Sequence, residues 1–365
     1  MTSTLTAAPT AGSKAASAHK RRPWVITGFA ALAVAYIVIP FLATDPVLYL
    51  FGYCAVLAVA ALGLTLLTGY AGQISLAQPF FIGIGAYATV FVTVQLGVPF
   101  AFDLVFAILV SGLVGAGSGW LAVRLGGLEL AIVTLGILVI GQYIFNTWTP
   151  VTGGETGVLS SGVEISLGPL NLEKLGTFTE QQSLFWVLWA TVAAVAFFCS
   201  MLVRRAPGRS WIALRENGRA AEAVGIHVRS TKIAIFALAS GIGGLAGGLY
   251  AGLQQYLSPL DFGFNTGMLL FAIVILGGIN RVAGAIIGAI IVPGVQFYIS
   301  EQADSLLLAP IITTGVTDSG FFTVGSFSTL IFGVLIVAVL AIEPDGIMGS
   351  LSRSRLYRRL TAHRP

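Results

Sequence analysis

Neutral polar side chains are the residues that could do chemistry inside the otherwise apolar stretches of this chain. Gln73, Ser75 and Gln78 cluster after a Gly-Tyr-Ala-Gly sequence, and Gln142 and Asn146 are four residues apart. Residues four apart share one face of a helix. Polar groups are costly in lipid, so these residues are expected to face the bundle interior or a water-filled path. For Gln142 and Asn146, a solute path and simple interhelical hydrogen bonding remain equally open.

Several kinds of chemistry have no sequence support. No lysine follows a glycine, so there is no G-x-x-x-x-G-K phosphate loop. No His/Cys/Asp/Glu cluster has metal-ligand spacing, and Cys54 and Cys199 lie in apolar runs, as buried hydrophobes do. We therefore expect neither an enzyme nor a cofactor-binding chain. No Asp, Glu or His is predicted deep in a span, with Asp103 and Glu129 at span ends, which argues against proton coupling but leaves sodium coupling open.

The composition identifies the class of protein that must position these side chains. Of 365 residues, 56% are hydrophobic and 9% are charged, whereas charged residues make up about 25% of a soluble protein. So few charges cannot cover a soluble protein of this length, and so high a hydrophobicity excludes disorder. The sequence predicts an all-α, polytopic transmembrane bundle.

Ten spans are expected. A helix crossing about 30 Å of hydrocarbon needs about 20 residues. Runs of this kind lie at 24–43, 47–68, 74–96, 104–123, 128–148, 183–203, 233–257, 266–280, 282–300 and 325–342. The apolar stretch 266–300 is divided into two spans at Arg281, because this division places the arginine at a membrane surface and avoids a buried charge. The span 266–280 is short and is expected to be tilted or partly unwound.

Basic residues set the expected orientation. With the N-terminus inside, all Lys and Arg except Lys174 fall on the cytoplasmic side, and most acidic residues fall outside. The inside segments are 1–23, 69–73, 124–127, 204–232, 281 and 343–365. This sorting predicts that both termini are cytoplasmic.

The domain organisation follows from the spans. We expect a disordered cytoplasmic tail at 1–23, a permease domain at 24–343 and a basic cytoplasmic tail at 344–365. Two longer loops interrupt the spans, an acidic outside loop at 149–182 and an arginine-rich inside loop at 204–232.

The arginine-rich inside loop contains one predicted short helix. It runs from Arg209 to Val224 and is followed by Gly225, which is a good helix end. Trp211, Ile212 and Leu214 could form an apolar patch. Periodicity alone allows this helix either to lie on anionic lipid or to dock onto a partner protein.

The sequence resembles the LivM-type permeases of branched-chain amino acid ABC importers. The segment 220–226 (Ala-Ala-Glu-Ala-Val-Gly-Ile), preceded by 207–217, is similar to the cytoplasmic signature of that family. Further similarities follow in family order at 69–76 with 83–87, 130–136, 152–154, 274–278 and 343–346.

The resemblance implies an importer subunit in the bacterial inner membrane. Its partners would be two cytoplasmic ATPases that bind ATP and Mg²⁺, a second, LivH-type permease, an extracytoplasmic solute-binding protein and membrane lipid, with no nucleic acid. Segment 209–225 would dock onto the ATPase, which favours docking over the lipid-surface alternative. The implied coupling residues are Arg215, Glu216, Ala221, Glu222, Ala223 and Gly225. The expected path residues are Gln73, Ser75, Gln78, Thr134, Gln142 and Asn146.

The transported solute is expected to be small and polar, with branched-chain or other hydrophobic amino acids favoured. Relatives often carry Gly-His or Gly-Gln where this chain has Ala77-Gln78, and an acid near position 142, where this chain has Gln142. Permeases of the same family for urea, amides or aromatic carboxylates therefore remain an alternative, as does a stand-alone ion-coupled carrier.

Overall fold

The structure, a computed structural model, describes residues 36–97, 100–160 and 179–301, with short pieces between 312 and 349. The chain divides into two units, 1–42 and 43–365. In the first unit, the described residues 36–42 are helical. The fold below is that of the second unit.

Several expected features fall outside these residues. They are the tail 1–23 and most of the tail 344–365, most of the spans 24–43 and 325–342, and the middle of the loop 149–182.

The described part of the second unit is almost entirely helical. Its long helices are α2 (Asp45–Leu64), continued by the π-helix η1 (Thr65–Tyr70), α3 (Gln78–Leu96), α4 (Phe100–Arg124), α5 (Gly127–Thr147), α7 (Glu180–Arg204), α10 (Val228–Leu253), α11 (Phe264–Gly277) and α12 (Val282–Glu301). The shorter ones are α6 (Thr149–Thr152), η2 (Gly154–Thr156), α8 (Ala206–Glu216), α9 (Gly218–Ala223) and η4 (Pro259–Phe262). β1 (Val158–Leu159) pairs with β2 (Tyr256–Leu257) in antiparallel fashion, and β3 (Ile312–Thr313) pairs with β4 (Phe322–Thr323) in parallel.

The predicted all-α bundle is therefore confirmed. Among the residues that the structure describes, five helices are long and apolar enough to cross a membrane: Asp45–Tyr70, Phe100–Arg124, Gly127–Thr147, Glu180–Arg204 and Val228–Leu253. Each matches one predicted span. The most apolar window of the first is 83% buried inside the protein, compared with 28% for the second. The Asp45–Tyr70 helix is thus central, whereas α4 exposes an apolar face to its surroundings.

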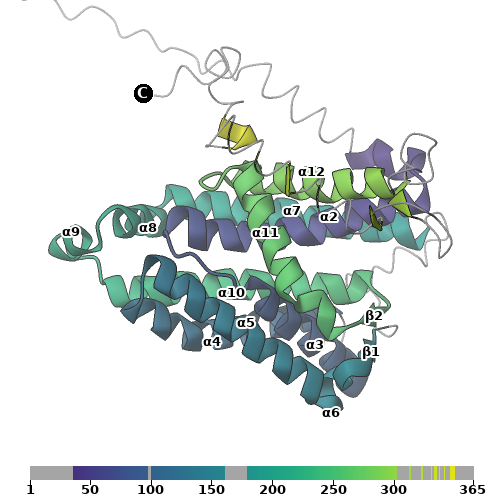
Figure 1. The fold of residues 1–365 in the computed structure, drawn as a ribbon, viewed down its shortest axis with the longest axis horizontal. Helices are drawn as coiled ribbons and strands as arrows, with labels where there is room; N and C mark the ends of the chain where they lie inside the picture. The colour runs from purple at the N-terminus through teal and green to yellow at the C-terminus, as the bar shows by residue number, and fades with distance from the viewer. Residues whose placement is uncertain are drawn as a thin grey trace, which may run out of the picture. The chain divides into compact units, whose positions relative to one another are not determined.

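Three further predicted spans, 74–96, 266–280 and 282–300, correspond to α3, α11 and α12. α3 begins at Gln78 and not at 74, because residues 71–77 have no regular secondary structure. α11 has 14 residues, or about 21 Å of helix, too short to cross about 30 Å of hydrocarbon. Figure 1 shows α11 running obliquely across its neighbours, which agrees with the expected tilt.

Glycines allow α10 to pack closely against two helices at once. A Cβ on Gly247 would lie 1.9 Å from the carbonyl oxygen of Ile82 in α3, and one on Gly244 would lie 2.5 Å from that of Ala107 in α4. Small residues spaced by four allow this kind of close backbone approach in lipid. Gly247 and Gly244 thus contact two different helices, which places α10 in the core of the bundle.

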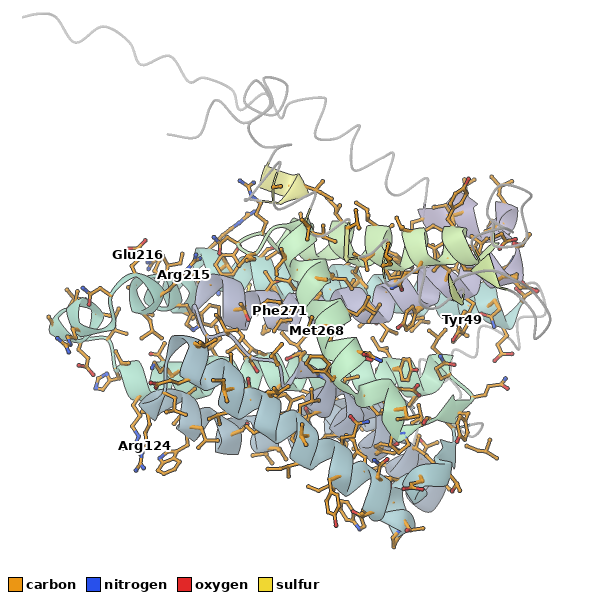
Figure 2. The ribbon with its side chains drawn as sticks, viewed as in Figure 1. Tyr49, Arg124, Arg215, Glu216, Met268 and Phe271 are labelled. Carbon is orange, nitrogen blue, oxygen red and sulfur yellow. The ribbon has the colours of Figure 1, made fainter. Side chains whose placement is uncertain are left out.

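The helices end at two ends of the unit. α8 and α9 lie at one end, which we call the inner end, and β1 and β2 lie at the other, the outer end (Figure 1). Figure 2 shows Arg124, Arg215 and Glu216 at the inner end and Tyr49 at the outer end. Two of the segments predicted to be on the inside, 124–127 and 204–232, thus share one end of the unit.

The close approach of α10 and α3 makes a stability prediction. We expect Gly247→Ala to destabilise the chain by about 1–3 kcal/mol, because the added methyl overlaps backbone that cannot move aside. Thermal unfolding in detergent measures the effect. The matched control is Gly117→Ala in α4, where a Cβ would meet nothing within 4 Å. Equal stability of the two variants would contradict this packing.

Candidate functional site

The arginine-rich inside loop folds as two helices, not as the single helix predicted over 209–224. α8 ends at Glu216, and α9 begins after Asn217. The Asn217 side chain accepts hydrogen bonds from the backbone N–H groups of Arg219 and Ala220, which caps α9. Asn and Gly at 217–218 are a helix-start signal that the sequence interpretation passed over.

Gly225 ends α9 as expected. Its backbone has φ of +87°, its N–H donates to the Glu222 carbonyl, and the Ile226 N–H donates to that of Ala221. This pair of bonds is a Schellman motif, in which glycine is preferred because the backbone is left-handed. A side chain at 225 would therefore strain the turn.

Of the predicted coupling residues, Ala221 is buried, whereas Glu216, Glu222, Ala223 and Gly225 are exposed. Trp211 and Leu214 of the predicted apolar patch are also buried. Because the apolar side of α8 packs on the bundle, it is not free to lie on lipid, although Ile212 stays 39% exposed. The exposed group forms a surface at the inner end that a partner could contact.

Arg215 is exposed at the inner end, and its side chain also bonds the bundle itself. Its Nη1 donates to the backbone carbonyl oxygen of Gly69 at 2.6 Å and also to the side-chain oxygen of Asn280. Gly69 lies in η1, at the C-terminal end of the central helix, where carbonyls lack intrahelical partners and a positive charge is favoured. Arg215 thus ties α8 to η1 and to the turn between α11 and α12.

Gly72 makes room for this arginine. Its φ is +67°, and a Cβ there would lie 2.8 Å from Cγ of Arg215. Gly69 is equally constrained, because a Cβ there would lie 1.9 Å from the Ile279 carbonyl oxygen. The Gly-Tyr-Ala-Gly sequence at 69–72 therefore serves this contact between α8, η1 and the 278–281 turn.

The irregular segment 71–77 enters the bundle beside η1. Irregular backbone at membrane depth must be buried in protein or line a water-filled cavity. Here the Leu76 N–H donates to Oγ1 of Thr134 at 3.0 Å, and the Thr68 hydroxyl donates to the Gln73 carbonyl at 3.2 Å. Side chains from α5 and η1 thus replace the missing helical bonds.

The predicted path residues have different environments. Gln78 is 1% exposed, and its Nε2 donates to the carbonyls of Ala60 at 3.4 Å and Ala239 at 3.2 Å, which joins α3 to α2 and α10. Thr134 and Ser75 are also buried and hydrogen-bonded. These three residues hold the segment 71–77 and the start of α3 in place.

Gln73 differs from these neighbours. It is 4% exposed, yet within the described part of the chain neither its amide nitrogen nor its amide oxygen has a hydrogen-bond partner. A buried amide without partners is costly, so water or a passing solute would be a favourable partner for it.

Gln142 and Asn146 lie on α5 at the outer half. Gln142 Nε2 donates to the Pro259 carbonyl at 3.1 Å, which positions η4, and Asn146 is half-buried. This bond favours the packing interpretation of Gln142. The structure does not decide the role of Asn146.

Asp103 is a buried acid that the sequence interpretation placed at a span end. It lies in the first turn of α4 but is 0% exposed, with Oδ2 accepting from the Thr93 hydroxyl at 2.5 Å. Its other oxygen has no partner among the described residues. The sequence feature that could have predicted its burial is the position of Asp103 between Phe102 and Leu104, inside an apolar run.

The comparisons with known proteins agree on one group. The model of the family described as "Branched-chain amino acid transport system / permease component" matches residues 47–340. The LivM permease of the high-affinity branched-chain amino acid transport system of Escherichia coli K12 is 30% identical over 276 residues, covering 71% of this chain and 64% of the relative. The LivH permease of Salmonella typhimurium LT2 is 24% identical over 306 residues, covering 80% and 91%.

A shorter similarity joins the chain to an autoinducer 2 import system permease, LsrC of Escherichia coli O9:H4, at 34% identity over 122 residues, or 33% of this chain and 34% of that one. The chain spans less than two thirds of the length of the two LivM relatives, 64% and 59%. No solved structure gives a significant match.

The anchor of segment 71–77 can be tested directly. We expect Thr134→Val to destabilise the chain by about 1–3 kcal/mol, because it leaves the buried Leu76 N–H without an acceptor. Thermal unfolding in detergent measures the loss. Thr147→Val is the control, since that exposed hydroxyl only bonds carbonyls of its own helix. An effect no larger than the control's would show that Thr134 does not anchor the segment.

Proposed function

Because the chain belongs to the permease family of branched-chain amino acid transport systems, we propose that it is the transmembrane subunit of an ABC importer for branched-chain or other hydrophobic amino acids. The match over residues 47–340 carries the proposal. The chain is a multi-pass protein of the inner membrane. The match and the five apolar spans support this placement.

We assign the inner end to the cytoplasm. The described basic residues support this assignment, because they occur in segments at the inner end, as the positive-inside rule requires. Lys232 Nζ donates to the Ala122 carbonyl at 2.9 Å, and Arg215 bonds Gly69, so these segments contact one another. Ten spans with both termini inside complete the topology.

The proposed partners follow from the relatives. A LivH-type permease would pair with this chain, two ATPases would bind ATP and Mg²⁺, and a binding protein would deliver the solute at the outer end. The exposed surface formed by Glu216, Glu222, Ala223 and Gly225 is where an ATPase would dock. Because this chain has no phosphate loop, the partner ATPases would bind the ATP, and their conformational change would act on this chain through that surface.

In this mechanism, Arg215 transmits the motion. An ATPase that moves α8 and α9 also moves Gly69 and Asn280, because Arg215 bonds both. That displacement reaches η1 and segment 71–77, where the unpartnered amide of Gln73 lies. ATP binding would thereby shift the bundle between its inward-open and outward-open states through differential affinity for the two.

Solute uptake tests the function as a whole. Cells lacking the chain should take up labelled leucine, isoleucine and valine more slowly than cells that carry it. Competition with phenylalanine, urea and benzoate then ranks the alternative solutes. If cells with and without the chain took up all three amino acids at the same rate, the proposal would be contradicted.

The docking surface makes a second prediction. We expect Glu222→Trp to abolish association with the ATPase and uptake while the chain still accumulates in the membrane, because a bulky side chain blocks the interface. Co-purification and uptake measure the two effects. Ser230→Trp, an exposed change at the start of α10, is the control. Normal association of the Glu222 variant would remove this residue from the interface.

Arg215 makes a third, different prediction. We expect Arg215→Ala to lower uptake about tenfold or more, because it loses hydrogen bonds from a charged group worth about 1.5–3 kcal/mol each. ATPase association and ATP hydrolysis in proteoliposomes should persist, so transport per ATP falls.

The control for Arg215 is Arg124→Ala. Arg124 is also exposed at the inner end, but its guanidinium lies over the Trp120 ring, 4.1 Å from the centroid. An Arg215 variant with normal transport per ATP would show that the arginine plays no part in transmission.

A further inference from the structure

A small cavity of about 80 Å³ lies toward the outer end, where α2, α3, α10, η4 and α11 meet. Its polar lining comes from Tyr53, Tyr250, Asp261 and Thr266, and the rest of its wall is apolar. No residue expected from the sequence to line a path belongs to it. The cavity is therefore separate from the segment 71–77.

The cavity changes character with depth. α2 begins at Asp45, so Tyr53 lies about 12 Å along the helix and Ala60, on the same face, about 22 Å. Tyr250 lies in the last turn of α10, also toward the outer end. The polar groups thus surround the outer part of the cavity. The rest of the cavity wall is aliphatic and includes Ile82 and Ala60.

Asp261 supplies the charge in the cavity. Its Oδ2 accepts from the Ser258 N–H at 3.0 Å, and no basic side chain among the described residues pairs with it. The carboxylate is partly buried, and it lines the same cavity as Tyr53 and Tyr250. The carboxylate therefore has no counter-charge within the described part of the chain.

Aromatic rings form a rigid wall beside this carboxylate. Phe262 is 1% exposed, and its ring packs edge-on against Tyr250 at 5.7 Å and Tyr87 at 5.6 Å between centroids. Aromatic faces attract cations through their quadrupole. The hydroxyl of Thr266 donates to the Asp261 carbonyl at 2.6 Å, so its lone pairs can accept from a ligand. These features together suit a group that is positively charged and donates hydrogen bonds.

We propose that this cavity binds the primary ammonium group of a small aliphatic solute, with Asp261 as the counter-charge, Tyr53, Tyr250 and Thr266 as hydrogen-bond partners and the apolar wall around the adjoining carbons. The inference rests on the proposed function, in that the solute would be the one transported. A cavity that binds benzene has about 150 Å³. At about 80 Å³, this one accommodates the ammonium group and a few carbons, and the rest of the solute protrudes.

A purely structural role for Asp261 makes a different prediction. In that case the carboxylate only caps η4 through the Ser258 N–H. Asp261→Asn separates the two roles, because the asparagine oxygen can still accept that bond while the charge is lost.

Thiol labelling of the full chain tests the charge of the cavity without transport. The native Cys54 and Cys199 are buried, so Thr266→Cys supplies the reactive thiol, and Val56→Cys replaces it if the first variant does not fold. We compare the rates of 2-aminoethyl and 2-sulfonatoethyl methanethiosulfonate. The cationic reagent should react about tenfold faster, because one unpaired charge within a few ångströms acts at low effective dielectric. Asp261→Asn should bring the two rates together.

A matched control reports the surface potential of the outer end. Leu159→Cys in β1 is at the same end and 67% exposed, and its rate ratio should not depend on Asp261. Equal rates of the two reagents at Thr266→Cys, or a ratio unchanged by Asp261→Asn, would overturn the proposal.

Protection then identifies the solute chemistry. We expect 3-methylbutylamine to slow the labelling severalfold and 4-methylpentanoate, which lacks the ammonium, to leave it unchanged. Protection by leucine as well assigns the site to amino acids, and protection by the amine alone assigns it to amines. Equal protection by the carboxylate would contradict an ammonium site. Failed labelling with intact leucine uptake would refute this site alone, whereas intact labelling without uptake would refute the proposed function.

Discussion

Polar groups in apolar surroundings must find partners, and this constraint explains most of the architecture. The chain has few charges, so backbone and neutral side chains satisfy most of the polar groups. Arg215 is the most consequential case, because it satisfies carbonyl and amide oxygens from segments 146 and 65 residues away. Without it, the C-terminal end of the central helix and the 278–281 turn would lose these hydrogen bonds to α8.

The same constraint organises the middle of the bundle. Where the backbone leaves the helical conformation at 71–77, Thr134 and Thr68 provide replacement bonds, and Gln78 connects the start of α3 to two other helices. Among the buried path residues that the structure describes, Gln73 alone has a side chain without a hydrogen-bond partner. A rigidly held segment with one unsatisfied amide can respond to small displacements of η1, to which Arg215 is bonded.

The sequence was sufficient to predict the helices but not the contacts between them. Length and hydropathy located α2, α4, α5, α7 and α10, because a membrane span is a property of a continuous run. Periodicity showed that 209–224 has an apolar side, yet it could not show that Arg215 bonds Gly69 and Asn280, because both residues are far away in the sequence. Asp103 was expected at a surface, and its burial depends on Thr93, which a hairpin of α3 and α4 brings beside it. The cavity around Asp261 needs five separate elements and has no local signature.

In the proposed mechanism, Arg215 carries motion from α8 to the inner ends of the helices. The most direct measurement is the distance between spin labels at Leu128, exposed at the start of α5, and Ala283, exposed at the start of α12. It is made in the reconstituted complex with and without ATP, on the native chain and on Arg215→Ala. If Arg215 transmits the motion, ATP changes this distance in the native chain and leaves it unchanged in the variant, although the ATPase is bound in both. The same change in both would show that the motion does not pass through Arg215.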